Sequence, residues 1–358
     1  MIQVRPYWGP DRGPDRGLYR RQVRHACIGS ALALLSAAAD ASVTLYGRID
    51  TDIEYQKGPA GSATQMVDNA SRWGMRGGED LGGGLRAAFG LEQGFAADSG
   101  VATNPQFRNA FVGLQGGFGA IALGRLDSAT IVGSPIYSQV TQNVDFAIHD
   151  AGATAIGTKV LNARNRVSNA LGYMTPDFGG FSVRARVNLA GPDPATPNAS
   201  SPVKAEDDFR QYDIGLNYAA GKFAAGLGYS RDAKTGGLVA NDFRDKVQAV
   251  ASYDFTVVNV YGLYGRDRYA GTATTRTDVP YWLVGFTVPY GAHSVTVNYM
   301  ERAVQRDPQG RLKKVQAAYG YRLSKRTMPY VFFDREDPNS HKDGDTVTTA
   351  GIGIQHKF

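Results

Sequence analysis

The stretch SVTLYGRIDTDIEY, residues 42–55, decides the fold because apolar and polar residues alternate along it. One parity is mainly apolar and holds Val43, Leu45, Ile49, Ile53 and Tyr55, whereas the other is polar and includes Arg48, Asp50, Asp52 and Glu54. Successive side chains of a β-strand point to opposite faces. The stretch therefore predicts a strand that lies between two different environments.

The same alternation recurs in segments 180–189, 211–218, 222–230 and 294–299. A β-sandwich also alternates, but here the segments are long, Tyr and Phe cap the apolar face, and the polar face carries charges. Lipid outside, water inside and aromatic girdles at both interfaces give that combination. We therefore expect an all-β, antiparallel transmembrane β-barrel. A helical membrane protein is excluded, since no 18 consecutive residues are apolar.

The connections between these segments can be counted. Tight turns are expected at residues 82–84, 116–119, 177–180, 219–222, 254–257, 289–292 and 323–327, and longer polar stretches near 56–70, 97–105, 127–163, 190–207, 231–245, 267–276, 303–311 and 334–345. Seven turns and eight loops join about sixteen strands. Short periplasmic turns that alternate with long external loops are typical of a bacterial barrel.

Residues 1–41 differ from the rest of the chain. Residues 20–41 combine basic side chains, a short apolar run from Ala26 to Ala39, and a small residue on each side of Asp40. This is the pattern of a secretory signal peptide, so we expect cleavage after Ala41 and a barrel domain over residues 42–358. Residues 1–19 are either an over-extended gene start or a disordered extension.

The charge balance argues against nucleic acid as a partner. Residues 1–41 hold six Arg and three Asp, so without them the net charge falls from +6 to +3. Nucleic-acid binding requires a concentrated basic patch rather than a high pI alone. The only cysteine, Cys27, lies in the expected signal peptide, so the mature chain has no thiol.

Several strings resemble the general porins of β-proteobacteria. They are SVTLYG at 42–47, SRWGMRG at 71–77, EDLGGGL at 79–85, YMTPDFGGF at 173–181, LSKRT at 323–327 and GIGIQHKF at 351–358. The resemblance spans the chain from residue 42 to 358. It implies an exported outer-membrane protein, a homotrimer of sixteen-stranded barrels, each a passive diffusion channel for small hydrophilic solutes and ions that its third external loop narrows.

The carboxy-terminal Phe358, with Ile354 and His356 at alternate positions, also resembles the signal that the outer-membrane assembly machinery reads. His356 fits that signal less well than an aromatic residue would. The alternative is that these residues only form the last amphipathic strand and carry no signal. Outer-membrane lipid and lipopolysaccharide are the other partners that the resemblance implies, and no ligand cluster for them stands out.

The stretch 127–163 is the longest connection and lacks an element pattern, and long structureless loops are usually functional. Its apolar residues could pack on the barrel wall while Asp127, Asp145 and Asp150 face water. By resemblance this loop folds inward, and arginines face it from the wall. We expect those to be Arg72, Arg108 and Arg166, and parity adds Arg48, Arg184 and Arg186.

Parity supports Arg72 against an outward Trp73 and Arg166 against an outward Val167, whereas Arg108 shares its parity with apolar Val112 and Leu114. Rings of arginine favour anions in a narrow passage. We therefore expect a moderate anion preference.

Other functions are weaker readings. A hydrolase needs a nucleophile, a base and an orienting group within reach of each other. No such motif is present, and His149, His293, His341 and His356 are scattered. We expect no enzyme activity, catalytic residue, cofactor or metal. A substrate-specific channel for small anionic solutes and, less readily, a non-conducting adhesive barrel stay open as alternatives.

Overall fold

The computed structural model describes residues 42–126, 166–189, 209–234, 236–271 and 277–358. Every regular element in these ranges is a β-strand. No helix that is long and apolar enough to cross a membrane occurs in them. The strands are β1 (Ser42–Gly58), β2 (Gly61–Asp68), β3 (Arg72–Gly82), β4 (Leu85–Phe95), β5 (Ala102–Gly116), β6 (Gly119–Leu126), β7 (Val167–Met174), β8 (Phe181–Asn188), β9 (Phe209–Ala220), β10 (Phe223–Lys234), β11 (Phe243–Asp254), β12 (Asn259–Tyr269), β13 (Asp278–Tyr290), β14 (His293–Ala303), β15 (Arg311–Tyr321), β16 (Thr327–Asp337) and β17 (Val347–Lys357). The expected signal peptide, residues 1–41, lies outside the described ranges.

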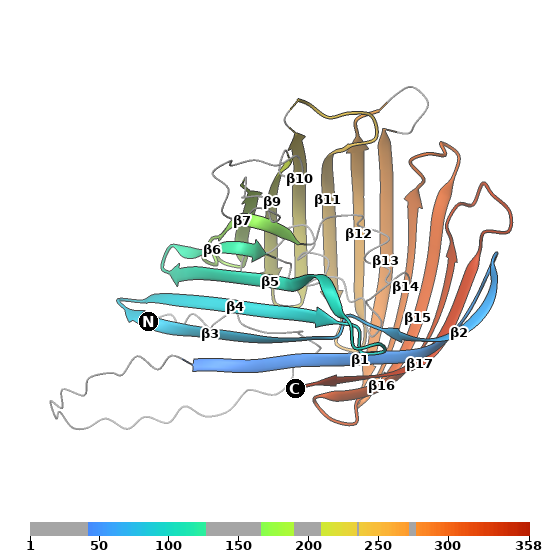
Figure 1. Ribbon diagram of the computed structural model, residues 1–358, viewed down its shortest axis with the longest axis horizontal. Helices are drawn as coiled ribbons and strands as arrows, with labels where there is room; N and C mark the ends of the chain where they lie inside the picture. The colour runs from blue at the N-terminus through green and yellow to red at the C-terminus, as the bar shows by residue number, and fades with distance from the viewer. Residues whose placement is uncertain (1–41, 127–165, 190–208, 235, 272–276) are drawn as a thin grey trace.

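The strands form one antiparallel sheet that closes on itself (Figure 1). The first and last strands complete the ring, from Arg48 opposite Lys357 to Lys57 opposite Thr348. On its other edge β1 pairs with β3 along its first half and with β2 along its second half. β2 and β3 are therefore one strand that is interrupted at residues 69–71. The structure is a sixteen-stranded barrel, which confirms the number predicted from the turns.

The two faces of the sheet are reversed relative to a soluble protein. Val43 and Leu45 are each 61% exposed, whereas Asp50 and Asp52, of the opposite parity, are 0% and 2% exposed. Large apolar side chains are exposed on the outer face of every strand of more than ten residues except β4, where they are half-buried. A sandwich would bury its apolar faces against each other. The exposed apolar face requires lipid around it, so the barrel spans a membrane.

Among the described residues the connections follow the predicted pattern with one exception, and the predicted loops at 127–163 and 190–207 lie outside those residues. All seven tight turns lie where they were predicted; in the first, Gly83 and Gly84 have φ values of +60° and +79°, which glycine adopts without strain. The predicted loop at 56–70 is wrong, because β1 and β2 continue to Gly58 and Gly61 and only two residues join them. Both faces of this end of the hairpin are polar. The two strands stay paired there, but apolar and polar residues no longer alternate, so the sequence does not indicate a strand.

Glycines on the inner face make room for aromatic rings on the neighbouring strand. Gly353 lies opposite Tyr330, and a Cβ atom on Gly353 would come within 2.5 Å of the Tyr330 ring. Gly265 and Tyr281 form the same arrangement, with a closest approach of 2.3 Å. These rings lie across the backbone of the adjacent strand, a device that shields the glycine of a twisted sheet. The high glycine content is thus partly a requirement of the inner face.

Candidate pore-lining site

The inner face of the barrel carries the predicted arginines. Arg48, Arg72, Arg108, Arg166, Arg184 and Arg186 all belong to the described residues, and none of them is fully exposed. Their predicted partners in the third loop, Asp127, Asp145 and Asp150, lie outside the described ranges.

Glu92 on β4 is the carboxylate that brings two of these arginines together. Its Oε1 lies 2.8 Å from Arg108 Nε on β5, and its Oε2 lies 3.5 Å from Arg72 Nε on β3. The Tyr46 hydroxyl donates a further hydrogen bond to Oε2 at 3.2 Å. The arginine side chains keep 16% and 17% exposure, whereas Glu92 keeps 4%. The cluster therefore presents guanidinium groups to the lumen and covers the carboxylate behind them.

A β-bulge explains why Arg108 points inward although its parity predicted otherwise. Glu92 pairs with Asn109, and the next residue of β4, Gln93, pairs with Phe107. Arg108 is the extra residue between these pairs. An extra residue bends the strand and re-aims a side chain. Val112 and Leu114 can thus face lipid while Arg108 faces the lumen.

Arg166 precedes β7, where the alternation also breaks. Leu171 and Tyr173 are exposed on the outer face as predicted, but Val167 is only 8% exposed and pairs with the inward Leu126. The expectation that Val167 faces outward is therefore wrong. Asn169 has a φ of +52°. Between the pairs Gly124–Ala170 and Leu126–Val167 the register of β6 and β7 shifts by one residue, so the side chain of Val167 faces inward instead of outward.

The two arginines of β8 lie on the inner face and are almost fully covered. Arg186 donates from Nε and Nη2 to Asp213 Oδ2 on β9, at 2.9 and 2.6 Å. Arg184 is 4% exposed. Arg48 on β1 is 5% exposed, and its Nη2 donates to the backbone oxygen of Asn69, where β2 and β3 are interrupted. All three belong to the wall, and hydrogen bonds fix the orientation of Arg186 and Arg48.

Sequence reasoning missed a second charged cluster on β11, β12 and β14. Lys246 Nζ lies 2.7 Å from Asp267 Oδ1, and Arg302 forms an ion pair with the other oxygen of Asp267. The ring of Tyr281 covers both cations, at 4.6 Å from Lys246 Nζ and 5.2 Å from Arg302 Cζ. The parity of Lys246 with Gln248 places it on the inner face, but only the register shows which strands bring the three charges together.

A third polar network closes the seam between the first and last strands. The Tyr330 hydroxyl donates to Asp50 Oδ1 at 2.8 Å and accepts from Asn69 Nδ2 at 2.9 Å. Asn69 Nδ2 also donates to Asp52 Oδ2, and Gln355 Nε2 donates to Asp50 Oδ2, each at 2.7 Å. These side chains come from β1, β16, β17 and the interruption between β2 and β3. Neutral donors thus hydrogen-bond to Asp50 and Asp52, and Arg48 Nε lies 3.9 Å from Asp50 Oδ2.

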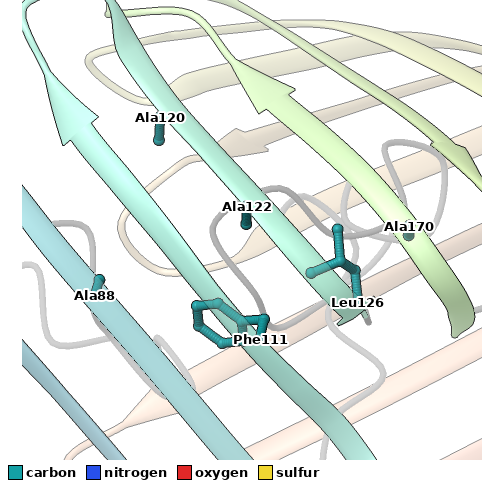
Figure 2. Close-up of a cluster of buried hydrophobic side chains, with 6 residues drawn as sticks. All are labelled: Ala88, Phe111, Ala120, Ala122, Leu126 and Ala170. Carbon is teal, nitrogen blue, oxygen red and sulfur yellow. The ribbon is translucent and has the colours of Figure 1, made fainter.

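One sector of the inner face is apolar. Figure 2 shows Ala88, Phe111, Ala120, Ala122, Leu126 and Ala170, which come from β4 to β7 and form one buried cluster. Their exposed fractions lie between 0% and 8%. Along the sequence, Leu126 is the residue directly before the predicted third loop. If only water covered this part of the inner wall, an apolar patch would not be expected there.

The inner face as a whole is polar and charged, and the barrel it lines is wide. A barrel of about sixteen strands leaves an aqueous lumen. Charges on a low-dielectric wall act on ions that pass through it. In the described residues no group of three or more His, Cys, Asp or Glu could hold a metal ion.

A model of the Gram-negative porin family matches residues 27–341. The chain belongs to this family. It is therefore a porin of the outer membrane, and porins are channels through which small hydrophilic solutes and ions diffuse passively. The inner face described above is the wall of that channel.

Known porins resemble this one over almost its whole length. Outer membrane porin protein 32 of Delftia acidovorans is 29% identical, over 92% of this chain and 98% of the relative. The solved structure of an anion-selective porin from Comamonas acidovorans is 26% identical, has a TM-score of 0.67, and covers 89% of this chain and 100% of its own. The trimer form of OmpT from Vibrio cholerae has a TM-score of 0.64, covers 89% of this chain and 99% of its own, and at 14% identity shares the fold alone.

Proposed function

We propose that this porin is an anion-preferring general diffusion channel. The observation that carries the proposal is the charge of the sector from β3 to β8. Five arginines lie there, Arg72, Arg108, Arg166, Arg184 and Arg186, and Glu92 and Asp213 form ion pairs with three of them. Guanidinium groups on the wall of the passage raise the local concentration of anions in it. The similarity to an anion-selective porin points in the same direction.

The third loop, residues 127–163, is proposed to fold inward and narrow the channel. Support comes from the apolar sector around Ala88, Phe111 and Leu126, which offers a packing surface on the wall (Figure 2). Ile131, Val132 and Ile136 of the loop suit such a surface. Asp127, Asp145 and Asp150 would then face the passage opposite the arginines and set a transverse field across it.

Diffusion measurements distinguish the general channel from its alternatives. Proteoliposomes that contain the porin should swell in neutral sugars at rates that fall with solute size, and bilayer conductance should rise linearly with salt concentration. Saturable uptake of one small anionic solute would instead indicate a substrate-specific channel. A folded protein without conductance would contradict the proposal in favour of an adhesive barrel or an enzyme.

Assembly and export belong to the same proposal. The porin is proposed to be a homotrimer, which the trimer form of the OmpT structure supports by its shared fold. Residues 1–41 are proposed to be removed during export, and Phe358 to be read by the assembly machinery; its backbone pairs with Gly47, which leaves its side chain at the seam of the barrel. Mass spectrometry of the purified protein tests the cleavage after Ala41, and chemical cross-linking tests the trimer.

A further inference from the structure

A cavity of about 220 Å³ lies on the inner wall of the barrel, on strands that do not carry the arginine sector of β3 to β8. Its floor is formed by Tyr269 at the end of β12, Val279 near the start of β13 and Arg302 near the end of β14. Tight turns lie at the other ends of these strands, where β11 meets β12 and β13 meets β14. Short turns are periplasmic. The cavity therefore lies at the external mouth of the channel.

Two external loops form the walls of the cavity, and a hydrogen bond links them. The loop between β14 and β15 contributes Val304 and Gln305, and the loop between β16 and β17 contributes Pro338. Asn339 Nδ2, next to Pro338, donates to Asp307 Oδ2 of the first loop at 2.9 Å. The two walls are thus held at a fixed separation. The cavity is a feature of the fold rather than a gap between independent loops.

The lining of the cavity carries a positive charge. Among the described residues that line it, Arg302 is the only charged one. Arg302 Nη2 donates to the Tyr269 hydroxyl at 3.3 Å, so the two polar groups lie together on the floor. Asp267, which forms an ion pair with Arg302, is 0% exposed and does not belong to the lining. A guanidinium group matches a carboxylate with a planar fork of N–H donors. The charge of the lining therefore favours an anion.

Most of the remaining lining is apolar. Val279 and Ala303 form a buried cluster with Tyr269, and Leu312 extends this surface into β15. The Tyr269 ring offers an aromatic face on which a planar ring can pack. The volume lies below the range of about 300–1,000 Å³ that is common for sites of drug-sized ligands. The lining therefore fits a small solute with one carboxylate and a compact, planar apolar body.

We propose that this cavity captures small aromatic monocarboxylates, of the class of benzoate, at the external mouth of the porin. The carboxylate lies at Arg302 and Tyr269, and the ring packs against Val279 and Leu312. The solute is then concentrated at the place where it enters the channel. The site is on β12 to β16, so it does not depend on the ion preference that the arginines of β3 to β8 give to the passage.

Saturation-transfer NMR of the porin in a non-ionic detergent tests the proposal. The probes are benzoate, benzamide, which keeps the ring but has no charge, and acetate, which keeps the charge but has no ring. Benzoate should bind saturably, and each of the other two should bind at least about tenfold more weakly, because each lacks one of the two matched features. Equal binding of benzoate and benzamide, or of benzoate and acetate, would overturn the proposal.

A pair of variants on one loop tests the position of the site. Gln305→Glu places a carboxylate on the lining without a change in side-chain size, and should weaken benzoate binding about tenfold through charge repulsion. Gln309→Glu makes the same change on the same loop but outside the lining, and should bind benzoate like the wild type. Arg302→Lys keeps the charge but loses the fork, and should lie between the wild type and Gln305→Glu.

Two controls complete the test. Heat-modified gel migration reports whether each variant is folded. Equal weakening in Gln305→Glu and Gln309→Glu would assign the effect to the overall charge of the external face, and the proposed site would be wrong. Because these measurements follow binding and not ion passage, a porin that binds benzoate as expected but prefers cations would contradict the proposed function and support this inference.

Discussion

Arg108 reaches Glu92 because one extra residue in β5 turns its side chain into the barrel, where its Nε lies 2.8 Å from Glu92 Oε1. The same carboxylate lies 3.5 Å from Arg72. One buried carboxylate therefore holds two partly exposed guanidinium groups at the wall of the channel. An ion that passes this part of the wall is closest to the two guanidinium groups, because the Glu92 carboxylate lies behind them.

Removal of the Glu92 charge should strengthen the anion preference. In Glu92→Gln, Arg72 and Arg108 lose their counter-charge while the amide can still accept a hydrogen bond. We expect the ratio of anion to cation permeability to rise by about twofold, because a charge in a narrow low-dielectric passage acts on ions through focusing. Reversal potentials under a salt gradient measure it. Glu79→Gln, on the exposed end of β3, is the matched control and should leave the ratio unchanged; an unchanged ratio in Glu92→Gln itself would contradict the assignment.

Tyr330 should stabilise the seam of the barrel through its hydroxyl. In Tyr330→Phe, Asp50 loses a donor at 2.8 Å and Asn69 loses an acceptor at 2.9 Å, both in a buried network. We expect the free energy of unfolding to fall by about 1–3 kcal/mol, the cost of leaving buried polar groups unsatisfied. Urea unfolding of the porin in detergent measures this change. Tyr264→Phe, on the outer face, should change stability little, and an equal loss in both variants would show that the network does not contribute.

Gly353 should tolerate no side chain. A Cβ atom at this position would lie 2.5 Å from the Tyr330 ring and 2.7 Å from Asp52 Cβ, so the ring would have to move. We expect Gly353→Ala to cost about 1–3 kcal/mol, typical of overpacking in a close-packed region. The measurement is the temperature at which the folded band disappears on a gel. Gly117→Ala, where a Cβ atom would meet nothing within 4 Å, provides the control.

Asp307 should tie two external loops together down to low pH. Hydrogen bonds from Asn339 and His341 and from the backbone amides of Gln309 and Gly310 hold the pKa of this carboxyl well below its usual range. A lowered pKa in the folded state means that the stabilisation is present above the ordinary pKa of aspartate, about 3.9, and is lost as the pH falls through the lowered value. The tie should therefore be complete at neutral pH and persist below about pH 4.

Hydrogen exchange of the Gln309 and Gly310 amides reports this tie, since both donate to Asp307 Oδ1. Exchange should stay slow from neutral pH to below the usual aspartate range. Asp307→Asn should speed it at neutral pH. Loss of protection in the wild type already near pH 5 would show that the carboxylate is not the element that holds the loops.

Much of the fold could be predicted because a membrane barrel separates lipid from water. Along a strand, the residues that face lipid are apolar and those that face water are polar, so the sequence alternates. Alternation gave the faces of β1, β8, β9 and β14, and turn residues gave the number of strands. Prediction was wrong where local geometry departs from a regular strand. The bulge at Arg108 and the reversal near Asn169 each shift parity by one residue, and neither leaves a signal in the residue types.

The charged clusters were predictable only in part, for a related reason. Parity placed Arg72, Arg184 and Arg186 on the inner face, but ion pairs depend on the register between strands that are far apart in the sequence. Arg302 and Asp267 are 35 residues apart in the sequence. They form an ion pair because the registers of β12 with β13 and of β13 with β14 place them within reach of each other on the inner face. The extended hairpin at the end of β1 was missed because alternation disappears where water lies on both sides.

The reversal potential of the porin in a planar bilayer tests the central claim most directly. A salt gradient across the wild-type channel should give a potential whose sign corresponds to preferred passage of anions, and R72Q/R108Q should shift it towards zero. K313Q/R335Q, which removes the same number of cations from the outer face, should leave it unchanged. A wild-type potential of the opposite sign, which means that cations pass preferentially, would contradict the account.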